Sequence, residues 1–113
     1  MFDKFIRGFH ILNLNKFRHI LLDIDGVILD QCFDNLFWSE LVPAEIAMIK
    51  GIKINDAKKE VINLGKKLEG TMPWYKLSYW EEIFKVDLIK PAIKNSSYIS
   101  FLPGAENTLK KLR

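Results

Sequence analysis

The chain has 113 residues, of which 49% are hydrophobic, and it carries a formal net charge of +3 with a sequence pI near 9.0. This length allows one domain at most, and the hydrophobic content excludes a disordered tail. The lysines are spread among acidic residues from Lys50 to Lys111. That distribution favours solvated helix faces and argues against a stripe that binds nucleic acid.

Signals for a membrane or for export are absent from the sequence. No apolar run approaches the ~20 residues that a membrane span needs, and no small-residue cleavage site follows the N-terminal apolar stretch, which argues against a signal peptide. Cys32 is the one cysteine, so no disulfide forms within the chain and a reducing compartment is expected. The sequence therefore predicts a cytoplasmic protein with no membrane and no nucleic-acid partner.

Two elements are expected before residue 30. The first is a short amphipathic helix, indicated by apolar residues at helical spacing, namely Phe2, Phe5, Ile6 and Phe9. The second is His19–Ile24, a short apolar run typical of a strand that is buried on both faces of a parallel sheet. Gly26 then allows a sharp turn, because glycine adopts backbone angles that are closed to other residues.

Four helices are expected between residues 33 and 84, because apolar residues recur there at intervals of three and four. Their ranges are 33–41, Ala44–Lys50, a helix ending near Leu68 and Trp74–Phe84. Pro43 suits the first turn of the second helix, and Gly51 suits its end. Asn55 or Asp56 is the expected N-cap of the third helix. The inward face of that helix is expected to carry Ala57, Val61, Leu64 and Leu68.

Turn-forming residues determine the prediction for the last quarter of the chain. Lys90-Pro91 and residues 95–97 are expected to form a boundary and a loop. The segment 101–104, which ends in Pro103-Gly104, predicts a turn that opens a final helix. Glu106 falls in the first turn of that helix, where a negative charge is favoured by the helix dipole.

The residues that indicate chemistry are Asp23 and Asp25, at the end of the predicted strand. Two carboxylates at a strand end that unwinds into a turn can converge on one site, and open α/β sheets bind ligands beyond the carboxyl ends of their strands. One carboxylate can attack phosphorus and form an acyl phosphate, while a second acts as general acid and then as general base. Mg²⁺ binds such carboxylates together with water and phosphate oxygens.

Two other interpretations of this motif were compared with the catalytic one. In a calcium-binding EF-hand loop, Leu21 and Cys32 would occupy the first and last ligand positions, and neither residue suits calcium. Alternatively, both aspartates are ordinary turn formers or caps at a strand end. The Asp-x-Asp-Gly motif alone leaves this last alternative open.

The longer segment HILLDIDGVILD, residues 19–30, resembles the first signature of the haloacid dehalogenase-like (HAD) hydrolases, a superfamily of aspartate-nucleophile phosphatases. The resemblance implies that Asp23 is the nucleophile and a magnesium ligand. It implies that Asp25 is the general acid/base and also binds the metal, through its backbone carbonyl. Val27 stands where the more common residue is Thr.

The resemblance also implies an α/β fold, namely an incomplete HAD-like Rossmannoid core with an inserted, mostly helical cap. Residues 1–30 are expected to form the N-terminal segment, the first core strand and the catalytic loop. Residues 31–100 are expected to form the helical cap, and residues 101–113 the helix that re-enters the core.

Two segments, LLDIDGVILDQCFDNLFWSELVP and EGTMPWYKLSYW, resemble the bacterial GMP/IMP nucleotidases of this superfamily. This resemblance implies a purine nucleoside 5′-monophosphate as substrate. Asn35, Trp74, Tyr75 and Trp80 are then candidate substrate-binding residues, since a purine base stacks on aromatic rings. The alternative is that the aromatic residues form the core of a small helical cap and that Asn35 caps a helix.

The HAD resemblance implies further parts that follow the re-entry helix: a Ser or Thr, a Lys and an acidic pair. The isolated chain is therefore expected to have little or no phosphatase activity and to be marginally stable or dependent on a chain that completes the core. The leading prediction is a magnesium-dependent phosphatase that works through an aspartyl-phosphate intermediate. The alternatives are a noncatalytic nucleotide- or protein-binding module and half of a split enzyme.

Overall fold

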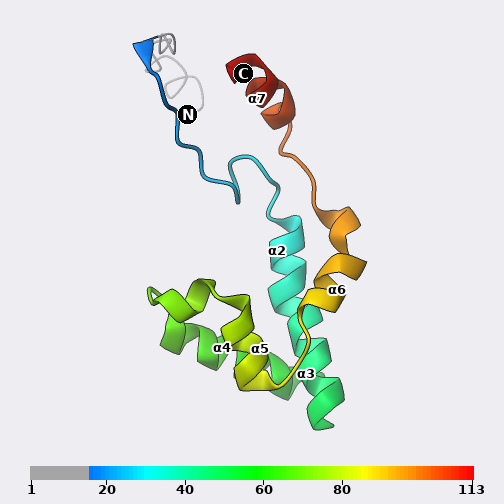
Figure 1. Ribbon diagram of the computed structural model, residues 1–113. Helices are drawn as coiled ribbons and strands as arrows, with labels where there is room; N and C mark the ends of the chain where they lie inside the picture. The colour runs from blue at the N-terminus through cyan, green and yellow to red at the C-terminus, as the bar shows by residue number, and fades with distance from the viewer. Residues whose placement is uncertain (1–15) are drawn as a thin grey trace, which may run out of the picture.

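The computed structural model describes residues 16–113. The amphipathic helix expected from Phe2 to Phe9 lies outside the described residues. A group of packed helices forms the middle of the chain. The segment before α2 (Cys32–Leu36) and the last helix, α7 (Ala105–Leu112), both extend from one end of this group (Figure 1). Within residues 16–113, no helix combines the length and the apolar character needed to cross a membrane.

The expected α/β core is wrong for the described residues, which contain no β-strand and only two isolated β-bridges. The apolar run His19–Ile24 is irregular, and the side chains of Leu21 and Ile24 are 97% and 56% exposed. A strand is held by hydrogen bonds to a neighbouring strand, and residues 16–113 supply none beside this run. The described chain is therefore a helical structure.

The first three helical elements follow one another with no break in the helical backbone. They are α2 (Cys32–Leu36), the π-helical turn η2 (Phe37–Leu41) and α3 (Val42–Lys50). In η2 the N–H of Val42 donates to the carbonyl of Phe37, five residues earlier. Pro43 explains this wider turn, because a proline ring clashes with the carbonyl four residues before it in a regular helix.

The boundaries of α3 agree in part with the sequence prediction. Pro43 lies in the first turn, as predicted, although α3 begins at Val42 and not at Ala44. Gly51 ends the helix with a φ of 65°, as predicted. This φ lies in the left-handed region that glycine adopts without a steric penalty.

The next elements are α4 (Ile54–Leu68), the 3₁₀-helix η3 (Met72–Tyr75) and α5 (Leu77–Phe84). Ala57, Val61 and Leu68 on α4 are buried, as predicted, and Leu64 is half-buried. The predicted N-cap at Asn55 or Asp56 is wrong, because α4 starts at Ile54 and is preceded by Lys53, which makes no side-chain cap. The helix predicted over 74–84 is divided at residue 76, whose backbone is extended.

The last elements are α6 (Ile89–Lys94), the 3₁₀-helix η4 (Ser96–Tyr98) and α7 (Ala105–Leu112). The boundary predicted at Lys90-Pro91 is wrong: Pro91 is buried inside α6, in the first turn, where a helix tolerates proline. The predicted loop at 95–97 contains the start of η4. The final helix is confirmed, with Gly104 at its N-cap and Glu106 in its first turn.

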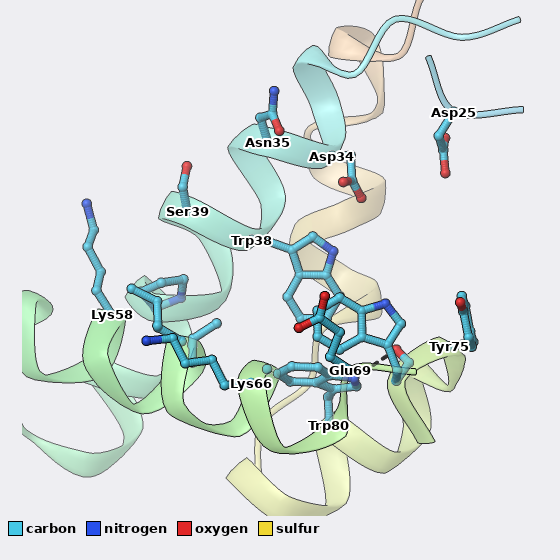
Figure 2. Close-up of a pocket in the computed structure, with 15 residues that line it drawn as sticks. Asp25, Asp34, Asn35, Trp38, Ser39, Lys58, Lys66, Glu69, Tyr75 and Trp80 are labelled. Carbon is cyan, nitrogen blue, oxygen red and sulfur yellow. Dashed lines mark hydrogen bonds between the residues drawn. The ribbon is translucent and has the colours of Figure 1, made fainter. Parts of the chain in front are cut away.

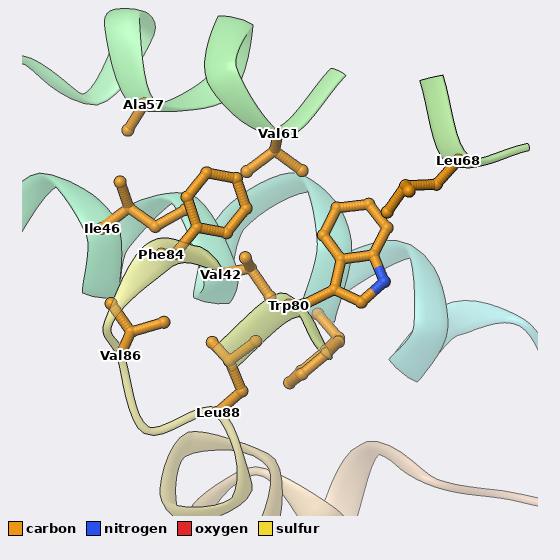
Figure 3. Close-up of a cluster of buried hydrophobic side chains, with 10 residues drawn as sticks. Val42, Ile46, Ala57, Val61, Leu68, Trp80, Phe84, Val86 and Leu88 are labelled. Atoms are coloured by element: carbon orange, nitrogen blue, oxygen red, sulfur yellow. The ribbon is translucent and has the colours of Figure 1, made fainter. Parts of the chain in front are cut away.

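One hydrophobic core holds the helices together (Figure 3). Its buried residues come from η2 to α5 and from the segment that follows α5: Phe37, Val42, Ile46, Ala57, Val61, Leu68, Trp80, Phe84, Val86 and Leu88. Ile46 and Leu88 are 0% exposed. Burial of a side chain of this size contributes about 1.5–3 kcal/mol to stability. The core thus fixes α4 and α5 against the helix that contains η2.

The segments that lead into and out of the helical part lie side by side. The N–H of Asp30 donates to the carbonyl of Ser100, and the N–H of Leu102 donates to the carbonyl of Ile28, each at 2.9 Å. These bonds flank an antiparallel bridge between residues 29 and 101. The two segments and α7 also enclose an apolar hollow of about 320 Å³, lined in part by Leu22, Val27, Ile28, Leu102 and Leu109.

Candidate functional site

A cavity of about 950 Å³ lies between the helix α2–η2, helix α4 and the aromatic segment η3–α5 (Figure 2). Its aromatic residues are Trp38, Trp74, Tyr75 and Trp80. Its polar and charged residues are Asp25, Asp34, Asn35, Ser39, Lys58, Lys66 and Glu69. The cavity therefore combines flat apolar surfaces with groups of both charges, as sites for small polar ligands commonly do.

Asp25 reaches the cavity from a tight turn. The carbonyl of Ile24 accepts hydrogen bonds from the N–H groups of Ile28 and Leu29, both at 2.9 Å. Gly26 has a φ of 76°, and a Cβ atom on it would lie 2.9 Å from the side-chain nitrogen of Gln31. The turn predicted at Gly26 is confirmed, and its backbone has room for glycine alone without a shift of Gln31.

The structure does not bring Asp23 into the same cavity. The side chain of Asp23 is exposed, and its Oδ1 accepts a hydrogen bond of 2.8 Å from the N–H of the next residue, Ile24. Asp30 accepts a hydrogen bond of 2.6 Å from the N–H of Cys32, two residues further on, just before α2 begins. In this structure Asp23 and Asp30 thus hold local backbone, as turn formers do, and Asp25 alone of the three lines the cavity.

The residues implied to hold magnesium do not form a metal site as they stand. Within residues 16–113 no group of three or more His, Cys, Asp or Glu side chains could hold a metal ion. Mg²⁺ demands near-octahedral geometry from oxygen ligands, and the Asp23 carboxylate accepts a hydrogen bond from the N–H of Ile24. The described residues therefore do not fit the ion by themselves.

The acidic partner of Asp25 is Asp34, on α2. The pKa of Asp34 is raised above its usual value, mainly because burial disfavours the charged form and also because the Asp25 carboxylate is close. The hydrogen bond from the Trp38 side chain acts in the opposite direction and lowers this pKa. The pair of interacting carboxylates at the cavity is thus Asp25 and Asp34, which stand nine positions apart in the sequence.

Asp34 was not among the candidate residues of the sequence analysis. Its position four residues before Trp38 places both on one face of the helix. That spacing was a usable signal, but it does not identify Asp25 as the group across the cavity, because this contact depends on the tertiary fold.

The predicted aromatic residues divide into two kinds. Trp80 is only 3% exposed, its indole N–H donates to the carbonyl of Trp74 at 3.2 Å, and its ring centroid lies 4.6 Å from that of Trp38. These contacts make Trp80 a core residue. Trp74 and Tyr75 are 37% and 77% exposed, so their rings are accessible to a ligand in the cavity.

The ring of Trp74 lies beside Gly65 of α4. A Cβ atom on Gly65 would lie 3.5 Å from the Trp74 ring and 3.8 Å from the Trp80 ring, which are ordinary contact distances. Asn35, the remaining predicted residue, also lines the cavity from α2 and makes no side-chain N-cap bond there. All four predicted substrate-binding residues therefore border one cavity.

Helix α4 contributes charged residues that the sequence analysis did not single out. Lys58 is paired with Glu40 at 2.8 Å. Lys66 and Glu69 also line the cavity, and among the described residues neither forms an ion pair. Charged residues along an amphipathic helix usually face solvent, so the sequence offered no signal that these belong to a cavity.

Comparison with known proteins gives partial matches to two curated proteins of the same name. The chain is 36% identical over 69 residues to the GMP/IMP nucleotidase YrfG of Escherichia coli (strain K12), and equally similar to the protein of the same name from Shigella flexneri. The aligned segment covers 61% of this chain and 31% of either relative, so the chain spans about a third of the length of the curated relatives that it matches. No protein-family model and no solved structure matches the chain significantly. The chain is thus similar to one part of a nucleotidase.

Proposed function

We propose that this chain carries the first catalytic loop and the substrate-covering helices of a phosphatase that acts on purine nucleoside 5′-monophosphates. The observation that carries the proposal is the cavity in which the accessible rings of Trp74 and Tyr75 share one space with Asp25. Stacking of a base on an aromatic side chain contributes about 1–3 kcal/mol. The likeness to two GMP/IMP nucleotidases supports a nucleotide as the ligand.

In the proposed reaction the Asp23 carboxylate attacks the phosphorus atom, and the bond between phosphorus and the ribose 5′ oxygen breaks. Asp25 donates a proton to that leaving oxygen. Asp25 then takes a proton from water, the water oxygen attacks the acyl phosphate, and inorganic phosphate leaves. This sequence requires the Asp23 carboxylate to give up its bond to the N–H of Ile24.

Magnesium dependence belongs to the proposal through the HAD resemblance of residues 19–30. When bound, such an ion neutralises charge on the phosphoryl group. Because residues 16–113 do not assemble a metal site by themselves, further ligands are required. A chain that completes the catalytic core is the proposed source of these ligands.

A second candidate function is a noncatalytic nucleotide-binding module. The specific observation in its favour is that the Asp23 carboxylate accepts a hydrogen bond from the N–H of Ile24 while the aromatic cavity is already formed. In this case the base would bind between the aromatic rings and the phosphate ester would stay intact.

The proposal is tested by binding and turnover on the same purified 113-residue chain. Calorimetric titration with GMP measures the affinity, and phosphate release from GMP, IMP and an aryl phosphate, with and without Mg²⁺, measures turnover. Tyr75→Ala is expected to weaken GMP binding about 5- to 150-fold, the equivalent of one stacking contact of about 1–3 kcal/mol. Tyr98→Ala is the matched control, because Tyr98 is 54% exposed and does not line the cavity.

The outcomes test the reaction and the nucleotide assignment separately. Phosphate release by the chain alone that disappears in Asp23→Asn supports the phosphatase and excludes the noncatalytic module. GMP binding without phosphate release, weakened in Tyr75→Ala and unchanged in Tyr98→Ala, supports the assignment of the cavity to a nucleotide and agrees with both candidates, because the proposed phosphatase needs metal ligands from a further chain. Absence of GMP binding, or equal affinities in the wild type and Tyr75→Ala, contradicts the assignment of the cavity to a nucleotide.

A further inference from the structure

Glu69 is an acidic residue of the cavity that the proposed reaction does not use. It directly follows the last residue of α4, and its backbone N–H bonds to the carbonyl of Gly65 at 3.0 Å, so the end of the helix fixes its position. Its side chain is exposed and lines the same cavity as Trp74 and Tyr75. Among the described residues Glu69 makes no ion pair. Its carboxylate oxygens are therefore available as acceptors for a ligand.

The two aspartates that line the cavity, Asp25 and Asp34, interact with each other. Burial and the charge of Asp25 both raise the pKa of Asp34, and Trp38 donates a hydrogen bond to Asp34. Asp25 belongs to the turn that the proposed reaction uses. Glu69 comes from the end of α4 and lines the same cavity as Trp74 and Tyr75, the accessible rings on which a base is proposed to stack.

The bases of GMP and IMP differ from adenine in what they present to a carboxylate. Guanine and hypoxanthine carry an N1–H donor beside the O6 acceptor, and guanine adds the N2 amino group as a second donor. Adenine has an unprotonated N1 acceptor at the same place. An ionised carboxylate accepts hydrogen bonds and donates none, so it pairs with N1–H and is repelled by the lone pair of adenine N1.

We infer that Glu69 binds the Watson–Crick edge of a 6-oxopurine base that stacks on the aromatic rings. Its carboxylate accepts a hydrogen bond from N1–H of hypoxanthine, or from both N1–H and the N2 amino group of guanine. This inference rests on the proposed function. Lys66 lies one helical turn before Glu69 on α4 and also borders the cavity. Its ammonium group is a donor suited to the O6 atom of the same base.

The test compares three nucleotides on three forms of the 113-residue chain. GMP, IMP and AMP are titrated by calorimetry into the wild type, Glu69→Gln and Glu82→Gln. Glu82 is an exposed residue of α5 that does not line the cavity, so it is the matched control. The wild type is expected to bind GMP most tightly, then IMP, then AMP.

In Glu69→Gln the affinity for GMP should fall about tenfold or more, as expected for the loss of a two-point base contact. The affinity for IMP should fall less, and that for AMP should not fall. Glu82→Gln should match the wild type with all three nucleotides. Because Glu69 is exposed, the variant is expected to retain the wild-type circular dichroism spectrum, which verifies that the fold is intact.

Two results would overturn the inference while leaving the proposed function in place. One is a wild type that binds AMP as tightly as GMP, and the other is an equal loss for all three nucleotides in Glu69→Gln. A wild type that binds none of the three overturns the proposed function, and this inference with it. A loss of GMP affinity that is equally large in Glu82→Gln also overturns the role of Glu69.

Discussion

The helical part of the molecule, residues 32–98, and the flanking segments 16–31 and 99–113 treat their apolar residues in opposite ways. Ile46 and Leu88 in the helical part are 0% exposed, while Leu21 and Phe101 in the flanking segments are 97% and 47% exposed. Helices satisfy their own backbone hydrogen bonds and need only one buried face. A run such as His19–Ile24 needs neighbouring strands for both its backbone and its side chains.

The difference shows which sequence patterns can form regular structure from contacts within a short stretch of chain. A helical period is satisfied within the 67 residues from 32 to 98, where α3, α4 and α5 close a core around one another. The apolar run before Asp23 carries an equally clear pattern, but its requirements are nonlocal. Within residues 16–113 it forms no sheet.

The largest expected effect tests whether the core lies wholly in the helical part. Ile46→Ala removes a fully buried side chain and is expected to lower the free energy of unfolding by about 2–5 kcal/mol. Leu21→Ala, at a 97% exposed site, should change it by no more than about 0.5 kcal/mol. Urea unfolding followed by circular dichroism measures both. Equal shifts of the two midpoints would mean that Leu21 is buried in solution and would break the comparison.

The next effect concerns the junction of the two regions. Asp30→Ala removes the carboxylate that accepts the Cys32 N–H at 2.6 Å, and loss of this hydrogen bond is expected to lower the free energy of unfolding by about 0.5–1.5 kcal/mol. Asp30→Asn keeps an oxygen acceptor and should remain close to the wild type. Thermal unfolding measures all three proteins. An Asn variant as unstable as the Ala variant would show that the charge of Asp30, and not its hydrogen bond to the Cys32 N–H, stabilises the fold.

A smaller effect is expected from alanine substitution at two glycines of the helical part. Gly65 has helical backbone angles, and Gly51 has a positive φ. Gly65→Ala should raise the free energy of unfolding by about 0.5–1 kcal/mol, because the site is helical and the new Cβ meets Trp74 at an ordinary 3.5 Å. Gly51→Ala should lower it by about 1 kcal/mol, because Gly51 has a φ of 65° and no atom within 4 Å of the new Cβ. Urea midpoints that move in the same direction would contradict this account.

The smallest effect is a dependence of stability on pH that arises from Asp34. Burial and the charge of Asp25 raise the pKa of Asp34 in the folded chain, so the folded state holds this proton more tightly than the unfolded state does. The stability of the wild type relative to Asp34→Asn should therefore be greatest at pH values below 3.8 and fall as the pH rises through the folded pKa. Melting temperatures of both proteins between pH 3 and pH 7 test this. A difference that stays constant, or that favours the wild type more at pH 7, would exclude it.

Much of the helical part was predictable because its signals are local. Gly51 and Gly104 end or open helices where the sequence places them, and Ala57 and Val61 are buried on the face that their spacing indicates. The wrong predictions concern residues that are compatible with more than one kind of local structure. Pro91 fits the first turn of α6 as well as it fits a boundary.

The candidate site was predictable in its members more than in its arrangement. The aromatic residues and Asn35 were identified from resemblance, and the structure brings them to one cavity. The pairing of Asp25 with Asp34, and the position of Glu69 at the cavity, follow from how α2 and α4 pack. No pattern along the chain encodes these neighbours, because each contact joins separate elements.

The antiparallel bridge between residues 29 and 101 has a consequence for protein engineering. The chain enters and leaves the helical part through adjacent, hydrogen-bonded segments. The two ends of this part therefore lie next to each other. Units with neighbouring ends tolerate transplantation into a loop of an unrelated host. Residues 28–102 include both bridged segments. They are therefore a suitable unit for transferring the aromatic cavity to another protein scaffold.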